Sequence, residues 1–262
     1  MASRWANARS DVLVIDLGQI QPTPWELNER KGKATPRIPL KDLIAVFTEL
    51  GARSVGLDID FSPKDGELIR PDDNDFFQWC LERSKQTHVP ILLGVFRTGS
   101  RPEEWLGDDR YMRLAAFIGI KDPDRAVYWV MAKGGFPLRS MSSAVAGLTW
   151  ESFLSDKNCF WSHLFEPTSI IDYGWLDPIR YDVLHAVNPD FYRGERDKIA
   201  NHMIVIGDTY GDERHAIGEP KKPDWFHPTA KDEQLPGVFL HACAAATIAA
   251  NKPIYQLTLL GR

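Results

Sequence analysis

Three short runs of nearly continuous apolar residues constrain the fold of this chain more than any other feature. They read DVLVIDLG (residues 11–18), VPILLGVF (89–96) and HMIVIGD (202–208). A fourth run, RSVGLDIDF (53–61), is similar apart from its two aspartates. Strands that are apolar along their whole length are buried on both faces, as in parallel sheets that helices cover. The runs therefore predict central strands of such a sheet.

Helical patterns separate these runs. PLKDLIAVFTELGA (39–52) repeats its apolar residues at helical spacing, and Gly51 is placed to end the helix. We also expect helices over residues 73–86, 140–154, 181–187 and 237–251, and strands over 124–133 and 168–174. Strands that alternate with helices predict an α/β fold, a single domain with a largely parallel, or mixed, central sheet flanked by helices. It is expected over residues 11–257, with 1–10 and 258–262 as flanking tails.

Composition limits the partners of the chain. Its 262 residues are 44% hydrophobic and 26% charged, which is typical of a globular domain. The formal net charge is −5 and there is no block of Lys or Arg, so we expect no nucleic acid partner. The three cysteines, Cys80, Cys159 and Cys243, are far apart and form no CxxC motif, which indicates buried single thiols.

Four aspartates lie at or near the ends of apolar strands: Asp16, Asp58, Asp60 and Asp208. The carboxyl ends of parallel strands share one edge of the sheet, where ligands bind. Asp58 and Asp60 are two residues apart, so they face the same side of a strand, roughly 7 Å from each other. The group suits a polar ligand or Mg²⁺. The alternative is that each acid caps a helix or pairs with an arginine such as Arg37 or Arg53.

The loop GDTYG follows the last apolar strand and places Asp208 and Thr209 between two glycines. It lacks the Lys-Ser/Thr of a phosphate loop and the GxGxxG of a dinucleotide site, yet its backbone N–H groups could cradle an anion. A simple glycine turn is the alternative. Asp212 and His215 provide two metal ligands where three are needed, so no metal site is predicted.

His241 lies near the start of the last long helix. If that helix packs beside the HMIVIGD strand, its N-terminus could meet the Gly-Asp-Thr loop, and His241 would join the ligand site. The alternative is a packed histidine hydrogen-bonded to backbone.

Catalytic motifs are missing from the sequence. There is no GxSxG nucleophile elbow and no HExxH. DID resembles the start of a haloacid-dehalogenase site, but Phe61, Ser62 and Pro63 follow it where Gly or Thr is expected. We therefore interpret the chain as non-catalytic, without a cofactor or metal. Two alternatives stay open: a Mg²⁺-dependent phosphatase or hydrolase that uses the strand-end aspartates, and a protein-interaction module.

The order of several segments carries a family resemblance. VIDLG is followed by GARSVGLDIDFS, PILLGVF, IDYGWLDPIRYDVL, MIVIGDTYGD and LPGVFLHA. This series, over residues 11–257, resembles the CHASE family, type two, the sensory extracellular domain associated with cyclases and histidine kinases. The link from Ala216 to Gln234 is longer than the family pattern, so the ligand specificity need not be shared.

The resemblance implies a ligand-sensing domain of a bacterial signal-transduction receptor. Such a domain sits on the extracytoplasmic face, and only segments absent from this chain would link it to the membrane and to a kinase or cyclase output. A cytoplasmic chain that reuses the fold is the alternative. The expected partner is an unknown small molecule or a protein, and a homodimer is plausible for such a receptor. The residues predicted to meet the ligand are Asp16, Asp58, Asp60, Asp208, Thr209 and His241.

Overall fold

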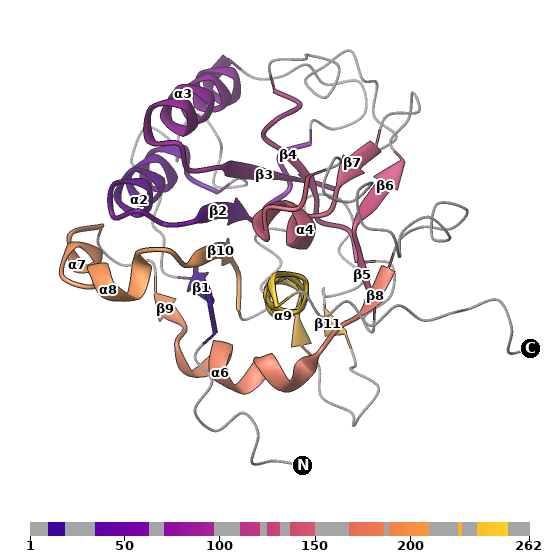
Figure 1. Ribbon diagram of the computed structural model, residues 1–262. Coiled ribbons are helices and arrows are strands. Elements are labelled where there is room, and N and C mark those ends of the chain that lie inside the picture. The colour runs from indigo at the N-terminus through magenta and orange to yellow at the C-terminus, as the bar shows by residue number, and fades with distance from the viewer. Residues whose placement is uncertain are drawn as a thin grey trace, which may run out of the picture.

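The computed structural model describes residues 10–18, 35–62, 71–96, 111–120, 125–131, 137–149, 168–185, 189–209, 225–226 and 235–250. Their centre is a six-stranded sheet (Figure 1). Its strands are β1 (Val12–Asp16), β2 (Ser54–Leu57), β3 (Ile91–Val95), β4 (Ala115–Phe117), β9 (Leu184–His185) and β10 (Met203–Gly207). Their spatial order is β4-β3-β2-β10-β1-β9, and every neighbouring pair is parallel. The chain therefore has the expected α/β fold.

Helices cover both faces of this sheet (Figure 1). One face carries α2 (Arg37–Glu49), α3 (Pro71–Thr87), α7 (Pro189–Arg193) and α8 (Arg196–Ile199). The other carries α4 (Met141–Val145), α6 (Leu176–Tyr181) and α9 (Gly237–Ala249). The single-domain arrangement with a parallel sheet between two helical layers agrees with the expectation from the sequence.

The side chains of the central strands alternate between two apolar clusters. Leu13 and Ile15 of β1 join the cluster beneath α2 and α3, whereas Val12 and Val14 join the cluster beneath α9. All five residues of β1 are buried, and so are all five of β10. Because each face needs apolar side chains, these strands are apolar up to their last residues, Asp16 and Gly207. This explains the runs from which the sheet was predicted.

Helix α2 ends as its sequence indicates. Its C-terminal cap is Leu50, and Gly51 follows with a positive φ of 81°. Glycine adopts this left-handed conformation without the steric cost that other residues meet. The chain then turns directly into β2.

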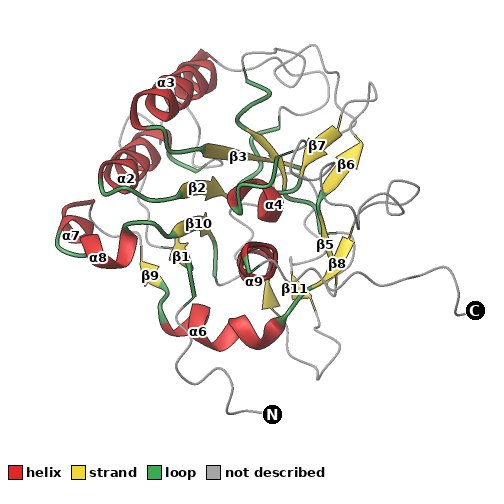
Figure 2. Cartoon of the chain, viewed as in Figure 1, coloured by secondary structure: helices red, strands yellow, loops and turns green. Residues whose placement is uncertain are grey.

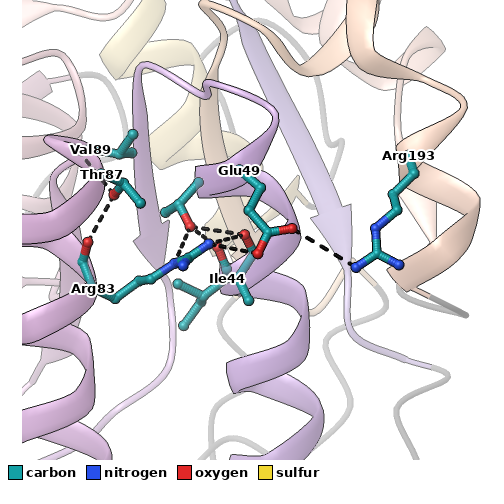
Figure 3. Close-up of polar contacts among 8 residues, drawn as sticks. Ile44, Glu49, Arg83, Thr87, Val89 and Arg193 are labelled. Atoms are coloured by element: carbon teal, nitrogen blue, oxygen red, sulfur yellow. Dashed lines mark hydrogen bonds and ion pairs between the residues drawn. The ribbon is translucent and has the colours of Figure 1, made fainter.

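Polar contacts join α2 to α3 and α7, which lie on the same face of the sheet (Figure 3). The Arg83 guanidinium donates to Thr48 Oγ1 over 2.9 Å, to the carbonyl of Ala45 over 2.9 Å and to Glu49 Oε1 over 3.0 Å. Glu49 Oε2 also lies 3.9 Å from Arg193 Nη2 in α7. Arg83 thus holds the C-terminal turn of α2 against α3.

Small antiparallel ribbons flank the sheet (Figure 2). They pair β5 (Arg125–Val127) with β8 (Thr168–Ile170), β6 (Trp129–Met131) with β7 (Pro137–Arg139), and β11 (Trp225–Phe226) with β12 (Leu235–Pro236). The single strand expected over 124–133 is therefore two, divided at Tyr128. The prediction was wrong because the two halves pair with different partners.

Two predicted helices differ from the structure. The helix expected over 140–154 is α4, which ends at Val145, and Gly147 follows with a φ of 79°. Residues 150–154 lie outside the described part. The helix expected over 181–187 is instead the end of α6 followed by β9, because Leu184 and His185 pair with Ile15 and Asp16 at the sheet edge.

The strand expected over 168–174 ends at Ile170, and a 3₁₀ turn, η3 (Tyr173–Trp175), capped by Asp172, follows.

Candidate functional site at the carboxyl edge of the sheet

Neighbouring strands β1 and β10 lead to opposite faces of the sheet. The next described helix after β1 is α2, and the next after β10 is α9 on the other face (Figure 1). In open parallel sheets a crevice forms at the carboxyl edge where adjacent connections diverge in this way, and ligands bind there. The candidate site is therefore the carboxyl edge at β1, β10 and β2.

Asp16 is the last residue of β1 and is fully buried. Its Oδ1 accepts hydrogen bonds from the backbone N–H groups of Gly18 and Thr209, both over 3.2 Å. The Leu17 N–H also donates to the Gly207 carbonyl over 3.0 Å. Asp16 therefore joins the turn after β1 to the turn after β10.

The charge of the Asp16 carboxylate also affects a residue on the face of the sheet that α2 and α7 cover. Burial raises the pKa of the Tyr192 hydroxyl, and the negative charge of Asp16 adds to that rise. Tyr192 belongs to α7, is fully buried and packs edge-on against Phe47, with 4.9 Å between ring centroids. Tyr192 thus remains a neutral phenol beneath the site.

The turn after β10 brings Asp208 and Thr209 to the surface of this edge. Both residues are half-buried, in contrast to the buried strand before them. Gly207 precedes them, and a Cβ atom there would lie 2.8 Å from Val238 Cγ2 and 3.2 Å from Asp58 Cβ. Glycine is therefore needed for the start of α9 and the end of β2 to approach β10 this closely.

Asp58 and His241 meet beside this turn. The N–H of Asp58 donates to the Ile206 carbonyl over 2.7 Å, which continues the pairing of β2 with β10. Asp58 Oδ1 lies 3.7 Å from His241 Nε2, and the same nitrogen lies 3.1 Å from the Ile118 carbonyl. The backbone hydrogen bond considered as the alternative for His241 is thus present together with a carboxylate contact.

Asp60 organises a neighbouring junction. Its Oδ1 accepts from the N–H of Ser62 over 2.9 Å and from the N–H of Phe96 over 3.2 Å. These contacts tie the end of β2 to the end of β3. Asp58 and Asp60 both follow the last residue of β2, Leu57, so the strand is shorter than expected and the two acids serve different contacts.

The six predicted residues thus form two pairs, with Asp208 next to one pair and Asp60 apart from both. Thr209 N–H bonds to Asp16, and Asp58 contacts His241. Asp208 adjoins the first pair, whereas Asp60 serves the junction with β3. The Ile118 carbonyl and Tyr192 were missed, since no residue pattern marks a backbone carbonyl and Tyr192 lies in a short helix that the sequence did not predict.

Arg37, considered above as a partner for the strand-end acids, pairs elsewhere. Its Nε donates to Asp73 Oδ1 over 2.8 Å, and its guanidinium lies 4.3 Å from the centre of the Phe61 ring. The contact joins the first turns of α2 and α3. Arg53 donates to the Ala146 carbonyl over 3.4 Å at the end of α4.

Metal-ligand groups and cysteine thiols are two further kinds of reactive group in the described residues. Within the described ranges, no group of three or more His, Cys, Asp or Glu residues could hold a metal ion. Burial raises the pKa of the Cys243 thiol to about 12, while the charge of Arg180 lowers this pKa somewhat and that of Asp172 raises it. Burial also raises the pKa of the Cys80 thiol. Both thiols are therefore protonated near neutral pH. Cys159, Asp212 and His215 lie outside the described residues.

Comparison with known proteins gives no match to a family model, a curated protein or a solved structure. No helix in the part of the chain that the structure describes is long and apolar enough to cross a membrane.

Proposed function

We propose that the chain is a non-catalytic, ligand-sensing domain of a signal-transduction receptor, of the CHASE type two kind that its sequence resembles. The observation that carries the proposal is the junction at the carboxyl edge, where β1 and β10 diverge to opposite helical layers. Asp208 and Thr209 are half-buried there, above the buried Asp16. A polar ligand of small size would bind at this turn.

The aspartates of the edge serve binding and architecture better than catalysis. Asp16 and Asp60 each accept two backbone hydrogen bonds, so their carboxylates hold turns in place. Two N–H donors on one carboxylate oxygen stabilise its negative charge, which weakens the carboxylate as a nucleophile or general base. The Mg²⁺-dependent hydrolase has no observation in its favour among the described residues.

Binding at this edge has a route to the rest of the domain. The turn after β10 contacts the start of α9 through Gly207 and Val238, and α9 packs along β1 and α4. A ligand that prefers one placement of the turn would shift the population of α9 placements by its difference in affinity. In the receptor we propose, α9 passes this change to the output module through segments absent from this chain.

The same proposal places the domain on the extracytoplasmic side of a membrane. Its partner there is a small molecule, and homodimerisation would let two copies of α9 report together. The location, the small-molecule partner and the homodimer all rest on the resemblance of GARSVGLDIDFS, MIVIGDTYGD and LPGVFLHA to the sensory family.

A thermal-shift screen tests the proposal. The purified chain is heated with amino acids, carboxylic acids, sugars and nucleotides at fixed pH, and one class should raise the melting temperature without being consumed. Asp208→Asn and Thr209→Val should remove the shift. Asp11→Asn is the matched control, because Asp11 is an exposed aspartate at the other end of β1. A panel without any shift, or a compound that is turned over, would contradict a sensory role.

A further inference from the structure

His241 lies between two oxygen acceptors, four residues after Gly237 begins α9. Its Nε2 is 3.1 Å from the Ile118 carbonyl and 3.7 Å from Asp58 Oδ1. A carbonyl oxygen only accepts, so in the neutral ring Nε2 carries the hydrogen and donates it to Ile118. The geometry thereby selects the tautomer and leaves Nδ1 as the nitrogen that takes up a further proton.

A proton on Nδ1 would place a positive ring beside a carboxylate where little water enters. The side chains of His241 and Asp58 are only 6% and 14% exposed. Opposite charges at such a separation attract more strongly when partly withdrawn from water. Because Asp58 follows β2 and His241 belongs to α9, the attraction acts between two different elements.

Other ionisable groups surround α9. Helix α4 and strand β12 contribute none. The other elements packed against α9, with their adjoining residues, carry ionisable groups that the structure describes: Asp11, Asp16, Tyr128, Asp172, Tyr173, Asp177, Arg180, Asp182, His202 and Asp208. Asp172 and Arg180 act on Cys243, further along the helix. Among the described residues, Asp58 is the ion-pair partner of His241.

We propose that protonation of His241 tightens the contact between the start of α9 and the end of β2, so that the carboxyl edge of the sheet responds to a fall in pH. An imidazole ring takes up a second proton as pH falls and becomes positively charged. The contact adjoins Gly207, whose hypothetical Cβ meets both Asp58 and Val238. Its part in sensing rests on the proposed function, whereas the contact itself needs no ligand.

Amide hydrogen exchange of residues 238–242 tests the proposal, with rates corrected for the intrinsic pH dependence of exchange. Between about pH 7.5 and about pH 5.5, exchange in the unaltered chain should slow by about threefold or more. His241→Gln keeps an amide donor for Ile118 but takes up no proton, and Asp58→Asn keeps the shape of the carboxylate without its charge. Both variants should lose the pH response.

His202→Gln is the matched control. His202 also contacts a backbone carbonyl, with Nδ1 3.1 Å from the oxygen of Ala200, but it precedes β10 at the opposite edge of the sheet. This variant should keep the response. A pH-independent exchange rate in the unaltered chain, or a response that survives in His241→Gln, would overturn the proposal, and Asp58→Asn decides alone if His241→Gln fails to fold. The measurement contains no small molecule, so failure of the ligand screen leaves its result unchanged.

Discussion

The backbone N–H of Thr209 donates a hydrogen bond of 3.2 Å to Oδ1 of Asp16, although the two residues are 193 positions apart in sequence. The same oxygen accepts from Gly18, so one buried carboxylate fixes the turns that follow both β1 and β10. These turns form the edge at which the chain diverges to the two helical layers. A strand residue beneath the candidate site therefore fixes both of its turns.

Asp16→Ala should reduce the free energy of unfolding by about 2 kcal/mol, since two backbone donors lose their acceptor at a mostly buried place. Urea denaturation measures the change. Asp11→Ala, at the exposed start of the same strand, should stay within about 0.5 kcal/mol of the unaltered chain. Equal losses in the two variants would show that the hydrogen bonds of Asp16 contribute little.

Gly207→Ala should destabilise the chain by about 1–3 kcal/mol, because the new methyl group overlaps the side chain of Val238. The ideal Cβ lies 2.8 Å from Val238 Cγ2, a distance that the packed core must relieve by moving α9. Gly194→Ala is the control, since its Cβ would meet only the Phe191 carbonyl at 3.6 Å.

A double substitution sharpens this second test. If the overlap is the cause, Gly207→Ala combined with Val238→Ala should cost clearly less than the sum of the two single changes. Purely additive losses in thermal or urea unfolding would point to the contact of the new methyl group with Asp58 Cβ instead.

The sequence predicted the central sheet well because burial on both faces leaves a strong pattern. The runs around Val14, Leu93 and Val205 are almost entirely apolar, and all three form parallel strands of the sheet. Gly51 marked the end of α2 for a similar reason, since its left-handed backbone is a local requirement. Local physics and the fold agree at these places.

Other elements depend on contacts that a local pattern does not contain. Leu184 and His185 resemble part of a short helix, yet they pair with β1 and extend the sheet. The approach of Asp58 to His241 likewise depends on where α9 packs. The contact of His241 with the Ile118 carbonyl leaves no signal in the sequence. The strand-end acids could be placed at one edge from the sequence, whereas their division into separate contacts required the structure.

Arg83→Ala should lower the free energy of unfolding by about 1–2 kcal/mol, mainly through the lost contacts to Thr48 and to the Ala45 carbonyl. The Glu49 carboxylate also accepts a hydrogen bond from Arg83, but the Glu49 side chain is 50% exposed. Glu49→Gln should therefore lower the free energy of unfolding by at most about 0.5 kcal/mol. Urea denaturation of both variants separates the two contributions. A larger loss for Glu49→Gln than for Arg83→Ala would contradict this division.

The Cys243 thiol should make stability fall at alkaline pH. Burial raises its pKa from an ordinary value of 9.0 to about 12, so the folded chain retains a proton that the unfolded chain releases. The stabilising effect is complete below about pH 9 and is lost as pH rises toward about pH 12, because the unfolded state alone ionises in that window. Cys243→Ala removes this contribution, so its free energy of unfolding should decline less steeply above about pH 9 than that of the unaltered chain.

Urea denaturation at a series of pH values measures both slopes, and Tyr192, which also titrates in the alkaline range, is common to both proteins. Parallel slopes would show that the thiol is reached by water in the folded state, in which case iodoacetamide should also label Cys243 without unfolding.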